Sequence, residues 1–483
     1  MTDKTQIPAS PLEHTCCARA EIALATQVNS LSAYLAKECQ ARWGINPPEF
    51  LLVRWLHEQT WGDSSGSSHP IFRRPQDVTS IRKELFKNVL GHTLSASRLA
   101  HQAARASVLE LYASMRDKIL TAYLRHIQWG CHDEAELFID VCYPAVAAGT
   151  TAAIYAFIQD RVEDFQSDLE AHYMPGLDEL CTTITQGAST RRYERCGLTC
   201  KCAIEIKVVE GGLVRISCEG ATCVITTEVR RKLYERYMKH AKTSNGIDQM
   251  QWPARLFCML CRYKTMRNVG ARTTHAAADY FYQGPLPQFL KALEMDTPSI
   301  EVYGTPLSAR SDLFCSAFPD VDRYFGCIGR PDELRRGWSL QQKLTGADGL
   351  VATSELPLSG RFIVHPPRIE AVMDQMADLL EAELARSEAA GAALTFMIIV
   401  PNWSSPPQKC QSVMDASAYK RMKPYEFWEG AYGMLSGKSH TQARPEIVAS
   451  KVPTLVYVLQ TSTAKCVLMS ALGVACKTAF VKV

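Results

Sequence analysis

One stretch, residues 361–400, limits the possible fold more than any other part of the chain. It begins with a short apolar run at 361–364 and ends with a second one at 394–400. Between them, residues 369–387 carry apolar side chains every three or four positions, which predicts a long helix. A strand, a helix and a strand at this spacing form a βαβ unit with parallel strands. Both runs are almost wholly apolar, which is typical of strands covered on both faces.

Further apolar runs at 299–303 and 454–459 are candidate strands of the same sheet. The predicted fold class is therefore α/β: residues 246–483 form a Rossmann-type domain with a mostly parallel sheet. A doubly wound sheet of this kind binds its ligands at the carboxyl ends of the strands.

Residues 1–245 are predicted to form a separate, mostly helical domain. Segments 97–128 and 134–170 repeat apolar residues at helical intervals. The pattern changes to alternation within 203–217, where Gly-Gly separates two short runs and predicts a β-hairpin. Residues 227–242 then predict a basic amphipathic helix, and we expect a domain boundary near residue 245.

Composition narrows the class of protein. The apolar fraction of 47% excludes a disordered chain. No run approaches the roughly 18 uncharged apolar residues of a membrane-spanning helix, so we expect no membrane partner. The first residues lack a basic start followed by an apolar core, and the chain has 18 cysteines. We therefore expect reduced thiols and an intracellular protein.

The charge of the chain is unevenly distributed. Formal net charge is +3, yet residues 191–272 hold 17 Lys and Arg against 7 Asp and Glu, a surplus of +10. By subtraction from +3, the remaining residues sum to about −7. A local basic surplus favours a polyanionic partner such as nucleic acid, and a solvated basic face is the other interpretation.

Five cysteines lie close together around the predicted hairpin: Cys196, Cys200, Cys202, Cys218 and Cys223. Four thiolates can hold Zn²⁺, but this spacing is not a pair of CxxC motifs. Small buried thiols are the favoured interpretation, and the sequence predicts no metal site.

The predicted strand 361–364 runs directly into His365, Pro366, Pro367 and Arg368. Proline lacks an N–H and keeps the preceding residue extended, so backbone carbonyls are expected to face the ligand crevice unpaired. Methyltransferases that act on adenine amines carry Asn or Asp, two prolines and an aromatic residue at this place. Two acceptors localise the amine lone pair for attack on a methyl sulfonium, and the aromatic ring stacks on the base. Taken alone, the four residues also fit an ordinary strand exit, which is more common.

A longer segment gives this tetrad its context. Residues 313–326, LFCSAFPDVDRYFG, resemble the cap-specific adenosine N6-methyltransferases, also known as phosphorylated-CTD-interacting factors. Other segments resemble that family in the same order: 254–266, 303–307, 396–403, 406–407, 419–421 and 455–460. The resemblance covers residues 250–465 and is loose over the helical first half.

The resemblance implies a helical domain beside a Rossmann-type methyltransferase domain, acting in the nucleus on capped mRNA. The reaction moves a methyl group from S-adenosylmethionine to N6 of the 2′-O-methyladenosine next to the cap. The implied catalytic residues are His365, Pro366, Pro367 and Arg368. The implied cofactor residues are Gly304, Thr305, Pro306, Asp320, Asp322, Phe325 and Gly326. The implied substrate contacts are Trp403 and, in a basic groove, Arg231, Arg236, Arg262 and Lys264.

This chain departs from the family at the tetrad. The family has Asn-Pro-Pro-Phe, whereas here His365 replaces Asn and Arg368 replaces Phe. A neutral imidazole can accept one hydrogen bond from the amine, whereas a protonated one cannot. Arg368 can stack through its guanidinium plane, but it also brings a cation near the sulfonium.

Two interpretations therefore stay open. In the first, which we favour, the chain is an enzyme with altered chemistry. In the second, it is an inactive relative that binds capped RNA or a partner protein. No tandem-Trp WW module is visible before residue 245, so binding to the RNA polymerase II C-terminal tail is the weakest expectation about partners.

Overall fold

The structure is a computed structural model. It describes residues 18–44, 46, 51–61, 69–73, 81, 175–186, 203–243, 246–247, 249–268, 300–344, 356–403, 408–435, 439–441, 447–450 and 452–464. The predicted helices at 97–128 and 134–170 lie outside these residues, as do Cys196, Cys200 and Cys202.

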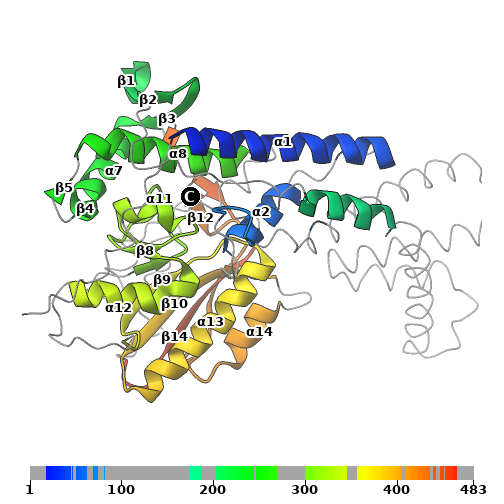
Figure 1. Cartoon of the computed structure of the whole chain (residues 1–483). Helices are drawn as coiled ribbons and strands as arrows, with labels where there is room; N and C mark the ends of the chain where they lie inside the picture. The colour runs from blue at the N-terminus through cyan, green and yellow to red at the C-terminus, as the bar shows by residue number, and fades with distance from the viewer. Residues whose placement is uncertain are drawn as a thin grey trace, which may run out of the picture.

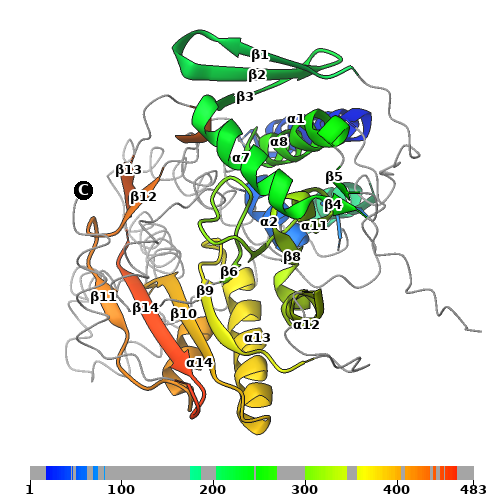
Figure 2. The same cartoon turned by 90° about the vertical axis from the view of Figure 1, so that its left-hand side faces the viewer.

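The described residues contain a mixed, mostly parallel sheet of seven strands (Figure 2). Across the sheet the strands are β11 (Tyr425–Phe427), β14 (Thr454–Gln460), β10 (Leu394–Pro401), β9 (Gly360–Val364), β6 (Ile300–Val302), β7 (Phe314–Cys315) and β8 (Cys327–Gly329). The five strands from β10 to β8 are parallel. β14 runs antiparallel to both of its neighbours, β10 and β11. This arrangement is compatible with a Rossmann-like fold.

The predicted βαβ unit is confirmed. β9 leads into α13 (Glu370–Ala389), and β10 then pairs parallel with β9. All residues of β10 are buried, as its continuous apolar sequence predicted. α13 packs Met373, Met376, Leu380 and Leu384 into the core of the sheet. α14 (Lys409–Ala416) contributes Cys410 and Met414 to the same core, and α12 (Leu334–Leu344) contributes Leu334.

A second, three-stranded antiparallel sheet is formed by β1 (Glu205–Val209), β2 (Leu213–Cys218) and β3 (Ala221–Thr226). β1 and β2 form the expected hairpin, and Gly211 and Gly212 adopt positive φ angles at its turn. β3 was not predicted. α7 (Thr227–His240) follows immediately, and the Thr226 hydroxyl caps it by accepting a hydrogen bond from the Val229 N–H at 3.2 Å.

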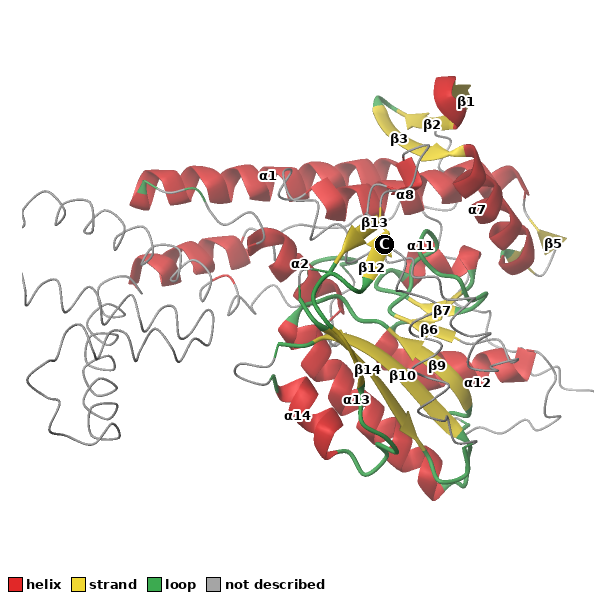
Figure 3. Ribbon diagram, turned by 180° about the vertical axis from the view of Figure 1, so that it is seen from behind, coloured by secondary structure: helices red, strands yellow, loops and turns green. Residues whose placement is uncertain are grey.

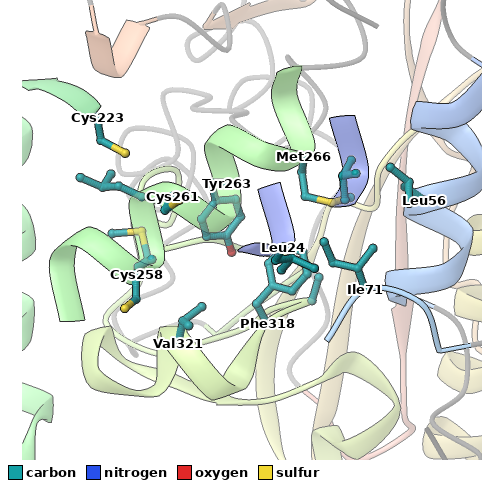
Figure 4. Close-up of a cluster of buried hydrophobic side chains, with 14 of the residues drawn as sticks. Leu24, Leu56, Ile71, Cys223, Cys258, Cys261, Tyr263, Met266, Phe318 and Val321 are labelled. Atoms are coloured by element: carbon teal, nitrogen blue, oxygen red, sulfur yellow. The ribbon is translucent and has the colours of Figure 1, made fainter. Parts of the chain in front are cut away.

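Helices α1 (Ala18–Trp43) and α8 (Trp252–Asn268) lie side by side, with the three-stranded sheet on one side of them and the seven-stranded sheet on the other (Figures 1 and 3). α2 (Leu51–Trp61) lies between α1 and the start of α13, where Arg54 Nη2 is 3.5 Å from Glu370 Oε2. Figure 4 shows the shared apolar core, in which Leu24 and Ile71 lie near Phe318 and Leu56 belongs to the same cluster, together with residues of α8. The predicted boundary near 245 assigns α8 to the C-terminal domain, although α8 packs along α1.

The remaining elements are short. Two strand pairs are β4 (Lys242–Thr243) with β5 (Gly246–Ile247), and β12 (Gly433–Leu435) with β13 (Ile447–Ala449). α11 spans Pro319–Asp322, and residues 175–186 are helical. Single 3-10 turns cover Glu210–Gly212, Gln249–Gln251, Arg323–Phe325, Pro331–Glu333 and Ser439–Thr441. Among the helices that the structure describes, none has the length and apolar character needed to cross a bilayer.

Candidate ligand site at the carboxyl edge of the sheet

The order of the strands marks one place in the sheet where a ligand is expected. From β6 the chain continues to β7 and β8 on one side, and it then returns to form β9 and β10 on the other. Open α/β sheets bind ligands outside the carboxyl ends of the strands at such a switch point. Here Val302 of β6 lies beside Val364 of β9, and the His365 N–H donates to the Val302 carbonyl at 3.4 Å. The structure thus brings together the predicted cofactor loop and the predicted catalytic tetrad.

The loop after β6 is held close to the sheet. A Cβ at Gly304 would lie 2.9 Å from Phe314 Cβ, so glycine is required there. The hydroxyls of Thr305 and Ser308 are 2.8 Å apart, and the Ser308 N–H donates to Thr305 Oγ1 at 2.9 Å. Tyr303 adopts a left-handed φ of 72°, a conformation that non-glycine residues seldom adopt outside functional or tight turns. Thr305 and Pro306 are buried within this fixed turn.

His365 is partly buried at the end of β9, and its ring meets Tyr432 edge-on at 6.1 Å. Burial, and secondly the positive charge of Arg368, lowers the pKa of His365 to about 3. The imidazole is therefore neutral at physiological pH, and a neutral imidazole has one nitrogen that can accept a hydrogen bond.

The two prolines after His365 are buried, but their carbonyls differ. The Pro367 carbonyl accepts a hydrogen bond from the Ile369 N–H at 2.7 Å as the chain turns into α13. The expectation that the carbonyls of this segment all face the ligand unpaired is therefore wrong for Pro367. The Pro366 carbonyl has no hydrogen-bond partner among the residues that the structure describes.

Arg368 is the residue for which the resemblance predicted a phenylalanine. Its guanidinium donates to Ser450 Oγ at 2.9 Å and to Thr454 Oγ1 at 3.5 Å. Thr454 begins β14, and β14 is antiparallel to β10, so this end of β14 lies at the same edge as His365. Two hydroxyl groups therefore hold the cation at the margin of the candidate site.

The two aspartates after β7 have different surroundings. Asp322 is fully buried and accepts a hydrogen bond from Tyr263 Oη at 2.6 Å. Burial raises the pKa of Asp322 to about 8. Asp320 pairs with Arg262 at 3.0 Å, and its side chain keeps 20% of its exposure. Of the two, Asp320 has the accessible carboxylate.

Phe325 and Gly326 precede β8 and therefore lie at its amino end, the edge opposite the switch point. Phe325 is fully buried against Tyr237 and Trp252. Gly326 has a φ of 103°, and a Cβ there would lie 2.2 Å from the Asp312 carbonyl oxygen. Their position does not support a cofactor contact, and both residues serve the turn into β8.

The four basic residues assigned to a groove have separate positions. Arg231 is exposed and pairs with Glu235 at 2.6 Å. Arg236 is buried and donates to four carbonyls, those of Ala309, Ser311, Asp312 and Phe325. Arg262 is fully buried and pairs with Glu21 through two hydrogen bonds of 2.6 and 2.7 Å. Lys264 Nζ donates to the Thr222 carbonyl at 2.5 Å. Direct RNA contact is thus not supported for Arg236 and Arg262.

Trp403 follows β10 at the carboxyl edge and packs, partly buried, against the core of the sheet. Sequence reasoning missed Tyr432, Ser450 and Thr454, which come from distant parts of the chain and have no motif.

Cys218 and Cys223 are buried thiols. Within the described ranges, no group of three or more His, Cys, Asp or Glu side chains could hold a metal ion.

The residues at this edge fit S-adenosylmethionine. The accessible Asp320 carboxylate suits ribose hydroxyls, and Gly304 lets the turn after β6 pack closely on Phe314. Beside them, the buried Pro366 carbonyl can accept a hydrogen bond.

Comparisons with known proteins match the part of the chain that contains this site. A sequence model described as "Phosphorylated CTD interacting factor 1 WW domain" matches residues 230–429, from α7 to the loop after β11. Two proteins named mRNA (2′-O-methyladenosine-N(6)-)-methyltransferase, from Mus musculus and Homo sapiens, are each 28% identical over 215 residues. The match covers 44% of this chain and 26% of each relative, so the chain spans about a quarter of the length of these proteins. The matched family model and these two relatives show that the chain is similar to the phosphorylated CTD interacting factor family over this region.

Proposed function

We propose that the protein is an S-adenosylmethionine-dependent RNA methyltransferase that acts on N6 of the 2′-O-methyladenosine next to the mRNA cap. The observation that carries the proposal is a pair of hydrogen-bond acceptors at the switch point. These are the neutral His365 imidazole and the Pro366 carbonyl, which are adjacent in the chain at the end of β9. Adjacent acceptors suit the two N–H groups of an adenine amine. A capped mRNA substrate implies action in the nucleus, where transcripts are capped.

In this mechanism the protein acts mainly by orienting the amine. The His365 imidazole and the Pro366 carbonyl accept hydrogen bonds from the two N–H groups. These bonds orient the nitrogen lone pair toward the methyl donor. Its lowered pKa makes His365 a weak base, so it positions the amine and does not take up a proton to any large extent. The edge contact with Tyr432 fixes the orientation of the ring. Gly304, Thr305, Pro306 and Asp320 would hold S-adenosylmethionine, which when bound would supply the methyl group and leave as S-adenosylhomocysteine, while N6 would release one proton to solvent. Trp403, the exposed Arg231 and the partly buried Lys264 are the remaining proposed substrate contacts.

The alternative is an inactive relative that binds capped RNA or a partner protein. It is favoured by Arg368, which places a guanidinium where the family has an aromatic ring. A cation near the positively charged sulfonium opposes methyl transfer. The RNA polymerase II C-terminal tail is a candidate partner through the description of the matched family model alone.

The test is methyl transfer from labelled cofactor to capped RNA that starts with 2′-O-methyladenosine. We expect transfer by the natural chain, and a gain of about tenfold or more for the double variant His365→Asn with Arg368→Phe. That variant restores a fixed acceptor and a stacking ring, and loss of one such group costs about 10²–10³ in rate. Arg386→Gln, at the far end of α13, is the matched control.

Two results would contradict parts of this proposal. RNA affinity without transfer by either protein would establish the binder. A loss of activity in the double variant would instead mean that His365 is adapted to the reaction and that the tetrad is not degenerate.

A further inference from the structure

Helix α2 covers part of the carboxyl edge of the seven-stranded sheet. Its last residue, Trp61, lies against Tyr303 with ring centroids 5.0 Å apart. Arg330 follows β8 directly and is only 2% exposed. Its Nη1 donates to the Thr60 carbonyl at 2.8 Å, and its Nε donates to Asp332 at 2.9 Å. Residues from the N-terminal part of the chain therefore form one wall of the candidate site.

Residues 69–73 extend this wall toward the loop after β7. Ile71 and Phe72 are buried, and the Phe72 ring packs 5.8 Å from that of Trp55. Figure 4 shows Ile71 beside Leu56 in the cluster that includes Phe318. In this segment Arg73 is partly buried, and its Nε is enclosed with no hydrogen-bond partner among the described residues.

The charges around Arg73 do not supply the missing acceptor. Burial, and secondly the charge of Arg330, lowers the pKa of Arg73 to about 10, while Asp320, Asp332 and Glu333 oppose the shift. Those carboxylates have other partners. Asp320 pairs with Arg262, Asp332 pairs with Arg330, and Glu333 accepts from the Arg330 N–H at 3.3 Å. A guanidinium Nε enclosed beside a second cation, with no acceptor among the described residues, is costly unless a ligand supplies one.

We propose that Arg73, flanked by Arg330, binds an oxyanion of the ligand at the carboxyl edge of the sheet. The inference rests on the proposed function for the identity of that ligand. Two sources share this chemistry: the carboxylate of the cofactor's amino-acid end, and a phosphate of the cap's triphosphate bridge. A guanidinium suits both, because its fork can make paired hydrogen bonds to two oxygens. The N-terminal part of the chain thus contributes a ligand-binding residue.

Calorimetric titration of the full chain distinguishes the two sources. The probes are S-adenosylhomocysteine, 5′-methylthioadenosine, which lacks the amino-acid end, and inorganic tripolyphosphate. The variants are Arg73→Gln and Arg73→Lys, and the control is Arg386→Gln on an exposed surface of α13. If the oxyanion is the carboxylate, Arg73→Gln weakens the binding of S-adenosylhomocysteine about 10- to 100-fold and leaves the binding of 5′-methylthioadenosine unchanged. If the oxyanion is a phosphate, Arg73→Gln weakens the binding of tripolyphosphate by the same factor. In either case Arg73→Lys weakens binding less than Arg73→Gln does.

Thermal unfolding gives a second readout. Tripolyphosphate or S-adenosylhomocysteine, whichever binds, should raise the melting temperature of the natural chain more than that of Arg73→Gln. Without ligand, Arg73→Gln should be at least as stable as the natural chain, because the enclosed Nε without a hydrogen-bond partner is gone.

Failure of this inference can be told from failure of the proposed function. If the natural chain and Arg73→Gln bind all three probes equally, the anion site is wrong and the proposed function is untouched. If the natural chain binds tripolyphosphate through Arg73 but no S-adenosylhomocysteine, the anion site stands and the proposed cofactor is wrong. If the natural chain binds neither anion, both are overturned.

Discussion

Asp320 and Asp322 are two residues apart in one motif, and the fold gives them different chemistry. Asp320 reaches the edge of the sheet and pairs with Arg262. Asp322 is enclosed, accepts from Tyr263, and has a pKa raised to about 8. The resemblance alone treats both as cofactor residues. Their separation depends on α8, which supplies both Arg262 and Tyr263.

We predict that Asp322→Asn stabilises the protein increasingly as the pH rises. The folded state holds the Asp322 proton between the ordinary pKa of 3.8 and about 8, whereas the unfolded state releases it. Stability contributed by this group is therefore lost as the pH rises through that interval, and asparagine removes the loss. Calorimetry at pH 5, 6.5 and 8 should show a gain in melting temperature that grows by at least about 2 °C.

Asp312→Asn is the matched control for this prediction. The pKa of Asp312 is lowered, first by its hydrogen bond to Lys239, so its substitution should cost stability at neutral pH. A gain from Asp322→Asn that is the same at all three pH values would contradict the prediction.

The tetrad shows what residue patterns can and cannot predict. The sequence predicted that His365 follows a buried strand, because apolar residues and two prolines define the strand end locally. It could not predict that Ser450 and Thr454 hold Arg368, since those residues lie more than 80 positions away. Nor could it predict the burial of Arg236 and Arg262, because the pattern of a basic helix predicts side chains that are exposed to solvent.

At the scale of elements, long periodic segments were predictable and short ones were not. β9, α13 and β10 appeared in the sequence almost to the residue. β7 and β8 have two and three residues, too few for any periodicity to show. Their positions are fixed by close contacts, such as that of α12 with β8 at Gly337.

We predict that Gly337→Ala destabilises the protein by about 1–3 kcal/mol, the usual range for overpacking. A Cβ at Gly337 would lie 2.2 Å from the Ile328 carbonyl oxygen, so α12 would have to move away from β8. The exposed neighbour Arg336→Ala lies on the same helix and should have little effect. Equal urea midpoints for both variants would show that α12 is free to shift.

At the scale of the molecule, the two predicted domains share buried surface. One apolar cluster joins residues of α1, α2 and the three-stranded sheet to Phe318, Val321 and Phe325. Arg262 of α8 depends on Glu21 of α1 for its buried ion pair. The boundary near 245 was placed where the sequence pattern changes, and a change of pattern carries no information about which surfaces pack together.

We predict that residues 246–483 alone do not unfold cooperatively. Without α1, the apolar side chains of α8 lose their cover, and Arg262 loses its ion pair with Glu21. Thermal denaturation followed by circular dichroism, with a dye that binds exposed apolar surface, compares this fragment with the full chain. A sharp transition and no dye binding in the fragment would establish an independent domain.

The connection from β6 to β7, residues 303–313, contains no helix in the structure, and Arg236 of α7 bonds three of its carbonyls. A crossover between parallel strands ordinarily carries a helix that satisfies its own backbone. Here side chains of other elements share that task, since Lys232 of α7 donates to the Leu307 carbonyl and Glu301 of β6 accepts from two backbone N–H groups. Grafting this sheet into a different protein would therefore require that α7 be grafted with it, or that a new hydrogen-bond donor be engineered for the carbonyl oxygens of residues 303–313. Among homologues that lack this arginine, we expect the connection from β6 to β7 to be longer and to form a helix of its own.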